Sequence, residues 1–169
     1  MISITEKKNC CGCTACASIC PKNAIEMIED NEGFLYPQVN KEKCVNCGLC
    51  DKVCPILNKK TSEIEPKAYA MRVKDDVVLK RSTSGGFFTP LAKYVLSKNG
   101  VVFGVGYDEN LKVIHKETKN LDNINEMIGS KYVQSYLGQS FKKVKDYLVK
   151  GTLVLFSGTP CQIAGLKII

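Results

Sequence analysis

Cysteine is the residue type whose spacing in this sequence predicts chemistry most directly. Eight of the ten cysteines fall into two blocks, residues 10–21 and residues 44–55, and both blocks read C-x2-C-x2-C-x3-C-P. The pattern recurs at a fixed offset, so it is an internal repeat. Three cysteines at intervals of three residues can bind three corners of a cubane iron–sulfur cluster from one short loop, and the fourth, followed by proline, points toward a neighbouring cluster. The two blocks therefore predict two [4Fe–4S] clusters.

Residues 5–57, which include both blocks, resemble a bacterial-type two-[4Fe–4S] ferredoxin module. In that signature the fourth cysteine of each block binds the cluster of the other block. The first cluster is then bound by Cys10, Cys13, Cys16 and Cys54, and the second by Cys44, Cys47, Cys50 and Cys20. Crossed ligation joins the two halves of a segment that is too short to build much core. Between the blocks, residues 25–28 and 34–39 are expected to form two short strands joined by a turn.

Two other uses of the cysteines fit the sequence less well. Structural zinc usually takes two cysteines from each of two separate knuckles, so three at successive x2 spacing suit it poorly. A disulfide framework belongs to secreted chains, and residues 1–8 lack the apolar run of a secretory signal. We therefore expect a cytoplasmic protein. Cys11 lies outside the regular spacing, and we expect it not to bind a cluster.

The composition excludes several further classes of protein. With 44% hydrophobic and 24% charged residues, the 169-residue chain can bury a core and is not expected to be disordered. No apolar run approaches the roughly 18 residues that a membrane span needs. The net charge of +7 arises mainly after residue 60, without a basic stripe carrying interleaved aromatic residues, so nucleic-acid binding is not expected.

The elements that would position further chemistry lie in the second part of the chain. We expect an α+β two-cluster ferredoxin module at residues 1–58, a polar linker at 59–66, and a partial α/β layered domain at 67–169. Strands are expected at residues 68–73, 101–107, 113–117, 132–134 and 153–156. Helices are expected at residues 87–97, 121–128 and 140–149 and from 160 onward.

The first of three loop motifs in this domain is the run Ser82-Thr83-Ser84-Gly85-Gly86, which precedes an expected helix. Ser84 as N-cap, followed by Gly85 and Gly86, would leave bare amides for a phosphate or another electron-rich group. A plain helix cap would look the same. Pro90 is at odds with a helix at 87–97, since it removes a backbone hydrogen bond.

The other two motifs are residues 129–135 and 153–166. The first places a cation, a phenol, an amide and a hydroxyl close together, in Lys131, Tyr132, Gln134 and Ser135, although an ordinary strand would alternate in the same way. The second is a buried strand followed by Gly158, Thr159, Pro160, Cys161 and Gln162. With proline at the first helical position, the Cys161 thiol would lie in the positive field of the helix dipole, which favours the thiolate. A small buried apolar side chain is the alternative role for Cys161.

Together the three motifs and the run at residues 101–104 resemble the N-terminal part of the beta-subunit family of coenzyme F420-dependent hydrogenases and dehydrogenases. The resemblance implies bound FAD next to iron–sulfur clusters, and electron exchange with F420 or a nicotinamide. It implies that the flavin is bound by Ser84, Gly85, Gly86, Lys131, Tyr132, Gln134, Ser135, Gly158, Thr159, Pro160, Cys161 and Gln162. Members of that family continue beyond the position that corresponds to Ile169, so the sequence is interpreted as an N-terminal fragment.

The expected function is that of an iron–sulfur flavoprotein oxidoreductase subunit. A flavin takes two electrons together and releases them singly, and iron–sulfur clusters carry one at a time, so the pair converts between the two. The alternative is a ferredoxin-type electron-transfer module without catalysis, docked on a redox partner protein or subunit. The single histidine, His115, lies in an expected strand and is assigned a structural role, and no catalytic residue is assigned.

Overall fold

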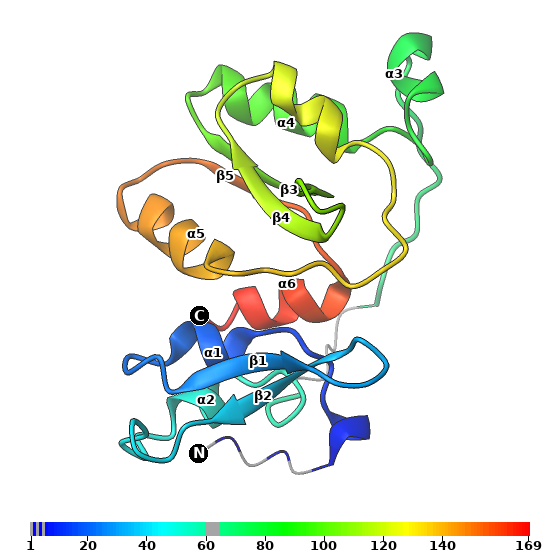
Figure 1. Ribbon diagram of the computed structural model, residues 1–169. Coiled ribbons are helices and arrows are strands. Elements are labelled where there is room, and N and C mark those ends of the chain that lie inside the picture. Colours follow the sequence, from blue (N-terminus) through cyan, green and yellow to red (C-terminus); the bar gives the residue numbers. More distant parts are fainter. Residues whose placement is uncertain (1, 3, 5, 60–64) are drawn as a thin grey trace. The chain divides into compact units, whose positions relative to one another are not determined.

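The structure is a computed structural model that describes residues 2, 4, 6–59 and 65–169 (Figure 1). The chain divides into two compact units. The first comprises residues 1–61 together with residues 159–169, and the second spans residues 62–158. The expected linker at 59–66 includes residues 60–64, which lie outside the described residues. The two units are described in turn.

The first unit contains a two-stranded antiparallel sheet and several short helices. Strands β1 (Ile25–Glu29) and β2 (Leu35–Val39) pair along their whole lengths, which confirms the two strands expected between the cysteine blocks. The remaining elements are η1 (Lys7–Asn9), α1 (Ala15–Ile19), α2 (Leu49–Lys52) and α6 (Pro160–Leu166). Pro37 lies opposite Met27 in this two-stranded sheet, where both strands are edges and a missing amide donor is tolerated.

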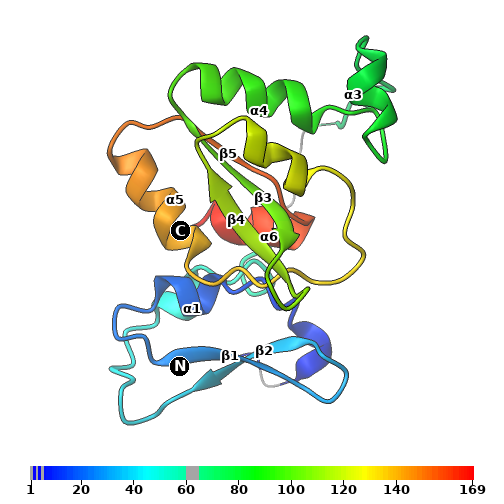
Figure 2. The same ribbon diagram turned by 45° about the horizontal axis from the view of Figure 1, so that its top comes forward.

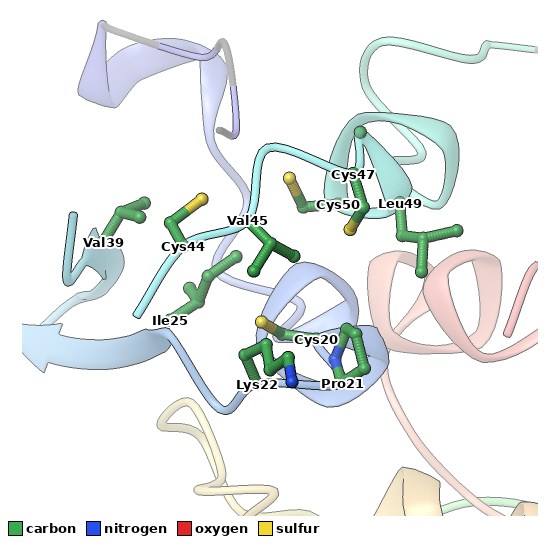
Figure 3. A pocket seen from close by; sticks show the side chains of 11 residues that line it. Cys20, Pro21, Lys22, Ile25, Val39, Cys44, Val45, Cys47, Leu49 and Cys50 are labelled. Carbon is green, nitrogen blue, oxygen red and sulfur yellow. The ribbon is translucent and has the colours of Figure 1, made fainter. Parts of the chain in front are cut away.

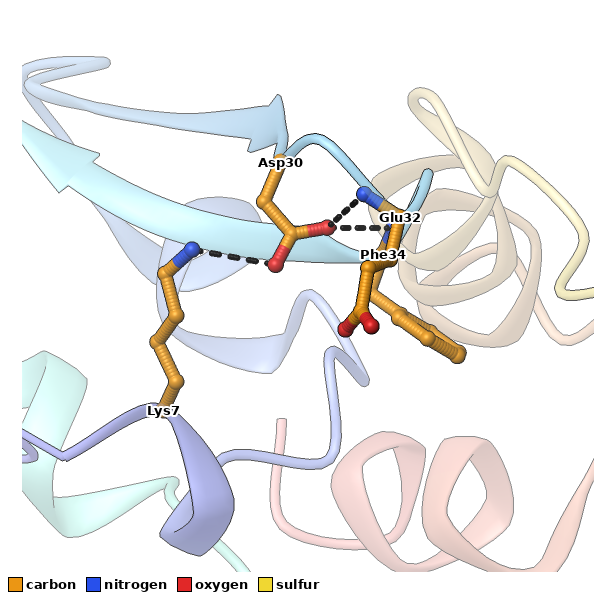
Figure 4. A network of polar contacts seen from close by, with 4 residues as sticks. All are labelled: Lys7, Asp30, Glu32 and Phe34. Atoms are coloured by element: carbon orange, nitrogen blue, oxygen red, sulfur yellow. Dashed lines mark hydrogen bonds and ion pairs between the residues drawn. The ribbon is translucent and has the colours of Figure 1, made fainter.

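The turn between β1 and β2 is held by one carboxylate. Asp30 Oδ1 accepts hydrogen bonds from the backbone amides of Glu32 at 3.0 Å and Phe34 at 3.1 Å (Figure 4). Asp30 Oδ2 pairs with Lys7 Nζ at 3.0 Å, and this lysine also lies over the ring of Tyr36. The Lys7 contact and the two amides hold the pKa of Asp30 below its usual range. Gly33, at φ +82°, completes the turn in the left-handed region that glycine adopts without strain.

Cysteines themselves form part of the core of the first unit. Cys16 of α1 and Cys50 of α2 are buried together with Ile25 of β1, and Met27 and Val39 pack against them. α1 and α2 each contain the third cysteine of a block and lie in contact with each other. The two halves of the internal repeat therefore share one small core.

Helix α6 belongs to the first unit although it comes from the C-terminal end of the sequence. A Cβ atom at Gly165 would lie 3.1 Å from Ala15 Cβ and 3.3 Å from Cys13 Sγ, so glycine allows α6 to approach α1 closely. Gln162 is 1% exposed, and its Oε1 accepts a hydrogen bond from the amide of Thr159 at 2.9 Å. The predicted second domain included residues 159–169, whereas in the structure this segment packs on the cysteine module.

The second unit is built on a three-stranded sheet in the order β4-β3-β5. β3 (Val101–Tyr107) pairs antiparallel with β4 (Val113–Thr118) and parallel with β5 (Val154–Phe156). Helices α4 (Phe88–Ser97) and α5 (Ser140–Val149) lie on opposite sides of this sheet in both views (Figures 1 and 2). All five of these elements were expected from the sequence.

The two faces of the sheet bury different sets of side chains. Val102 lies in a cluster with Ala92 and Val95 of α4 and with Ile124 and Met127 of the 3-10 helix η2 (Asp122–Met127). The neighbouring Phe103 faces the other way and contacts aromatic rings of α5 and β5, namely Tyr147 and Phe156. This alternation is what a strand covered by helices on both faces requires.

Several expectations for the second unit were wrong. Residues 68–73 and 132–134 are not strands, and the only pairing near the latter that the described residues show is a single bridge between Ile114 and Tyr136. Residues 121–128 form the 3-10 helix η2 instead of an α-helix, and α3 (Asp76–Lys80), capped by the Asp75 carboxylate, was not predicted. Short apolar runs have strand-like composition, but in the structure neither of these two pairs with a strand of the sheet along its length.

Pro90 does not disturb helix α4. The helix begins at Phe88, so Pro90 is its third residue, where the backbone amide would have no partner within the helix. Phe87, and not Ser84, occupies the N-cap position, so the expected capping role of Ser84 was wrong. Within the described residues, no helix has both the length and the apolar character to cross a membrane.

Candidate iron–sulfur site

Two cavities in the first unit are lined by cysteines. The first cavity is lined by apolar side chains that include Ile4, Met27, Pro37 and Ile56. Its cysteines are Cys10, Cys13 and Cys16 of the first block, the neighbouring Cys11, and Cys54 of the second block. Cys13, Cys16 and Cys54 are buried, and Cys10 is half-buried.

The second cavity has the reciprocal composition (Figure 3). It is lined by Cys44, Cys47 and Cys50 of the second block and by Cys20 of the first. Figure 3 shows Cys20 extending from the end of α1, while Cys44 and Cys47 come from the segment that leads into α2 and Cys50 comes from α2 itself. Cys47 is exposed and Cys50 is buried, and Lys22 and Val45 also line the opening. Each cavity therefore combines three cysteines of one block with the fourth of the other.

The backbone of the two cysteine loops repeats along with the sequence. Gly12 and Asn46 occupy equivalent positions and have φ of 61° and 52°, and Thr14 and Gly48 do so with φ of 61° and 74°. These left-handed residues turn each loop so that the next residue begins α1 or α2. Glycine and asparagine adopt this conformation readily, whereas a threonine rarely does. The left-handed backbone of Thr14 was not predicted from the sequence.

A backbone amide lies close to one thiol of each cavity. The amide of Gly12 donates to Cys10 Sγ at 3.5 Å, and the amide of Ala24 donates to Cys20 Sγ at 3.3 Å. Hydrogen bonds to cysteine sulfur stabilise the thiolate and are one means by which a protein sets the reduction potential of a cluster.

The electrostatics of the cavities suit a cationic occupant. Burial raises the pKa of Cys10, Cys16 and Cys50 above the ordinary value, for Cys16 to about 12. Neighbouring thiols raise the pKa of Cys10 and Cys16 further, and the Asp51 carboxylate does so for Cys50. Cysteine binds iron as the thiolate, and several thiolates in an apolar cavity are stable only beside a positive charge. The donor set therefore fits iron in both cavities.

Among the described residues, no three His, Cys, Asp or Glu side chains converge on one point where a lone metal ion would sit. The cysteines of a cubane need not converge in that way, because each thiolate binds a different iron atom of the cluster.

Comparison with protein families agrees with this geometry. Residues 9–57 match the family model of the 4Fe-4S dicluster domain. This stretch contains all eight cysteines of the two blocks and both strands of the first sheet. The dicluster domain thus accounts for the N-terminal part of the chain and assigns it to iron–sulfur electron transfer. A search of curated proteins found no match to the chain.

The residues predicted to bind flavin are divided between the two units. Ser84, Gly85, Gly86, Lys131, Tyr132, Gln134, Ser135 and Gly158 belong to the second unit, and Thr159, Pro160, Cys161 and Gln162 to the first. Within the second unit, two of the motif loops do lie together: Thr83 Oγ1 is 3.0 Å from Ser130 Oγ and accepts from the Ser130 amide at 3.2 Å.

Packing and hydrogen bonds within the second unit position several residues of its two motif loops. A Cβ atom at Gly85 would lie 2.4 Å from the carbonyl oxygen of Met71, and one at Gly86 would meet Val73. Lys131 Nζ donates to the carbonyl oxygens of Glu126 at 3.1 Å and Ile128 at 3.0 Å, and burial lowers its pKa. The Tyr132 side chain is 92% exposed. Close packing thus accounts for both glycines and for the position of the lysine.

His115 connects the second motif loop to the end of β5. Its Nε2 lies 3.0 Å from the carbonyl oxygen of Ser157, and its Nδ1 lies 3.0 Å from Ser135 Oγ. The carbonyl can only accept, so Nε2 carries the hydrogen and Nδ1 accepts from the Ser135 hydroxyl. The ring stacks on Phe156 with centroids 4.9 Å apart, and burial lowers the pKa of His115. These contacts agree with the structural role expected for this residue.

Cys161 lies in the first turn of α6, as the sequence predicts, with Thr159 as N-cap and Pro160 at the first helical position. Its Sγ is 3.1 Å from Thr159 Oγ1 and 3.9 Å from the carbonyl oxygen of Cys11. The contact between Cys161 and Cys11, which are 150 residues apart, was not predicted from the sequence.

Proposed function

We propose that the first unit transfers single electrons through two [4Fe–4S] clusters bound with crossed ligation. Cys10, Cys13, Cys16 and Cys54 would hold one cluster, and Cys20, Cys44, Cys47 and Cys50 the other. The observation that carries the proposal is the composition of the two cavities, each of which unites three cysteines of one block with the last of the other. When bound, such clusters supply reversible one-electron transfer over a wide range of potentials.

The residues around the cavities have separable roles in this function. The apolar walls of the first cavity exclude water, and the amides of Gly12 and Ala24 stabilise thiolate charge. The contact between Cys16 and Cys50 in one buried cluster brings the two cavities to opposite sides of a shared wall. This short separation suits electron transfer from one site to the other within the unit. The exposed Cys47 gives an external redox partner, a protein or subunit that the proposal requires, access to the second cavity.

The test is anaerobic purification followed by iron and acid-labile sulfide assays per mole of chain. Two cubane clusters correspond to about eight iron and about eight sulfide per chain. Stepwise reduction followed by electron paramagnetic resonance should show two reduced clusters that interact magnetically. Iron far below eight per chain after reconstitution would contradict the proposal.

We propose as a second candidate that the second unit adds a flavin, which would make the chain an oxidoreductase subunit that exchanges electrons with F420 or a nicotinamide. The observation in its favour is the Thr83–Ser130 contact, which brings the loops at 82–86 and 129–135 together. When bound, a flavin supplies conversion between two-electron and one-electron transfer. Ser84 and Gln134 are polar side chains of these loops that could contact it, whereas the Ser135 hydroxyl is buried against His115.

Flavin content distinguishes the two candidates. The chain is purified, soaked in FAD and separated from free cofactor, and released flavin is identified by chromatography. One FAD per chain would support the oxidoreductase subunit. Full iron without flavin would leave the electron-transfer module alone.

A further inference from the structure

The proposed clusters use eight of the ten cysteines, and the two that remain lie in contact with each other. Cys11 is in the first cysteine loop, and Cys161 is in the first turn of α6. The thiol of Cys161 reaches the backbone carbonyl oxygen of Cys11 at 3.9 Å. The Cys11 thiol also lies beside that of Cys13, which belongs to the proposed ligands of the first cluster. No local sequence pattern predicts a contact between two cysteines that are 150 residues apart.

The position of Cys161 is fixed by the packing of α6 on the first unit. Gly165 lies against Ala15 and Cys13, and the buried Gln162 closes the N-terminal turn of the helix through the Thr159 amide. The Gly165 contact places α6 against the first cysteine loop, and the capping bond fixes the turn of the helix that carries Cys161. Both Cys11 and Cys161 are half-buried, so a small reagent can reach them.

We propose that Cys11 and Cys161 form a redox-active thiol pair, which low-molecular-weight disulfides oxidise to a disulfide bond that joins α6 to the first cysteine loop. The inference rests on the proposed function, because the two thiols are surplus only if the other eight bind iron. It assigns to the chain a modification site separate from the clusters.

The exchange proceeds in two balanced steps. The Cys11 thiolate attacks one sulfur of the disulfide RSSR, a Cys11–S–S–R bond forms, and RS⁻ leaves and takes up the proton that Cys11 lost. The deprotonated Cys161 then attacks the Cys11 sulfur, forms the Cys11–Cys161 bond and expels the second RS⁻, which is protonated in turn. Two protein thiols are oxidised, and one RSSR is reduced to two RSH.

The experiment uses the iron-loaded full chain and glutathione disulfide as the probe. After anaerobic incubation, free thiols are blocked by alkylation, and unreduced proteolytic peptides are analysed by mass spectrometry. The expected result is a peptide linked through Cys11 and Cys161, with iron per chain unchanged, and a higher urea concentration at the unfolding midpoint. Failure to form this link, with both cysteines recovered alkylated, would overturn the proposal, as would a link between either of them and another cysteine.

Two matched variants separate this site from the clusters. In Cys161→Ser the reaction should stop at glutathione bound to Cys11, and in Cys11→Ser at glutathione bound to Cys161, while both variants keep the full iron content. Loss of iron from either variant would make that residue a cluster ligand and overturn the pair. Low iron in the unaltered chain would contradict the proposed function, whereas a Cys11–Cys161 link in that same protein would still support the pair.

Discussion

Cys54, the last cysteine of the second block, lies in the same cavity as Cys10, the first cysteine of the first block. The charges of the two thiols interact, and Cys54 is one cause of the raised pKa of Cys10. The reciprocal pairing places Cys20 beside Cys44 in the second cavity. Neither half of the repeat can therefore complete a four-cysteine site without the other.

Crossed ligation predicts which cysteine variants behave alike. In Cys54→Ala the first site loses a ligand, so iron should fall from about eight to about four per chain, and the spectrum of the remaining cluster should match that of Cys10→Ala. Cys20→Ala should instead match Cys47→Ala. The measurement is iron content together with electron paramagnetic resonance of the reduced proteins.

The control for this set is Cys11→Ala, which should retain all of its iron. A spectrum of Cys54→Ala that matched Cys47→Ala would show ligation within each block and would rule out the crossed arrangement.

His115 predicts a pH dependence of the stability of the second unit. Burial holds its folded pKa below the ordinary 6.5, so the unfolded chain binds a proton more readily than the folded one. The stabilising contribution is complete above about pH 6.5 and is lost as the pH falls through the lower folded pKa. Urea unfolding at pH 7.5 and pH 5.5 should show a loss of stability that is smaller in His115→Gln.

Because His115 is the single histidine of the chain, the difference between the two proteins isolates its titration from acid effects on the cysteine sites. An equal pH dependence of stability in the unaltered chain and in His115→Gln would mean that folding does not change the pKa of His115.

Gly165 predicts a steric limit on the packing of α6. A valine there would press against Ala15 and Cys13, whose atoms lie 3.1 Å and 3.3 Å from the Cβ position. Overpacking of this kind costs about 1–3 kcal/mol, so Gly165→Val should lower the free energy of unfolding of the first unit. Chemical denaturation of the iron-loaded protein measures this loss.

Ala164→Val is the matched control, since it adds a β-branched side chain to the same helix at the neighbouring, more exposed position. Equal losses in the two variants would attribute the effect to helix propensity and not to the contact with α1.

Gly85 predicts a backbone constraint in the second unit. A Cβ atom at this position would lie 2.4 Å from the carbonyl oxygen of Met71, which belongs to the backbone and cannot rotate away. Gly85→Ala should therefore destabilise the second unit by about 1–3 kcal/mol and displace the loop at 82–86. Thermal unfolding followed by circular dichroism measures the effect.

Gly106→Ala provides the comparison. Its Cβ would meet chiefly the flexible end of the Lys116 side chain at 2.9 Å, so the change should be close to neutral. A neutral Gly85→Ala would mean that segment 71–73 does not hold the loop.

The sequence predicts the dicluster module well because cluster chemistry constrains it locally. Cysteines three residues apart must face one centre, and residues 9–57 hold both repeats and the hairpin between them. Long periodic segments such as β3, α4 and α5 were also predictable, because an apolar face must be buried wherever the helix or strand packs. Residues 68–73 have a strand-like composition but form no strand. Composition alone therefore does not predict a strand, since a strand must also pair with another strand of a sheet.

The sequence by itself predicted the two sets of cysteines that line the two cavities, because in the dicluster signature the fourth cysteine of each block serves the cluster of the other block. Only the tertiary structure decided where the C-terminal segment lies. The contact of Cys161 with Cys11 depends on Gly165 fitting against α1 and on a buried Gln162. Such contacts join residues distant in sequence through the fit of their side chains, and no local sequence pattern predicts them.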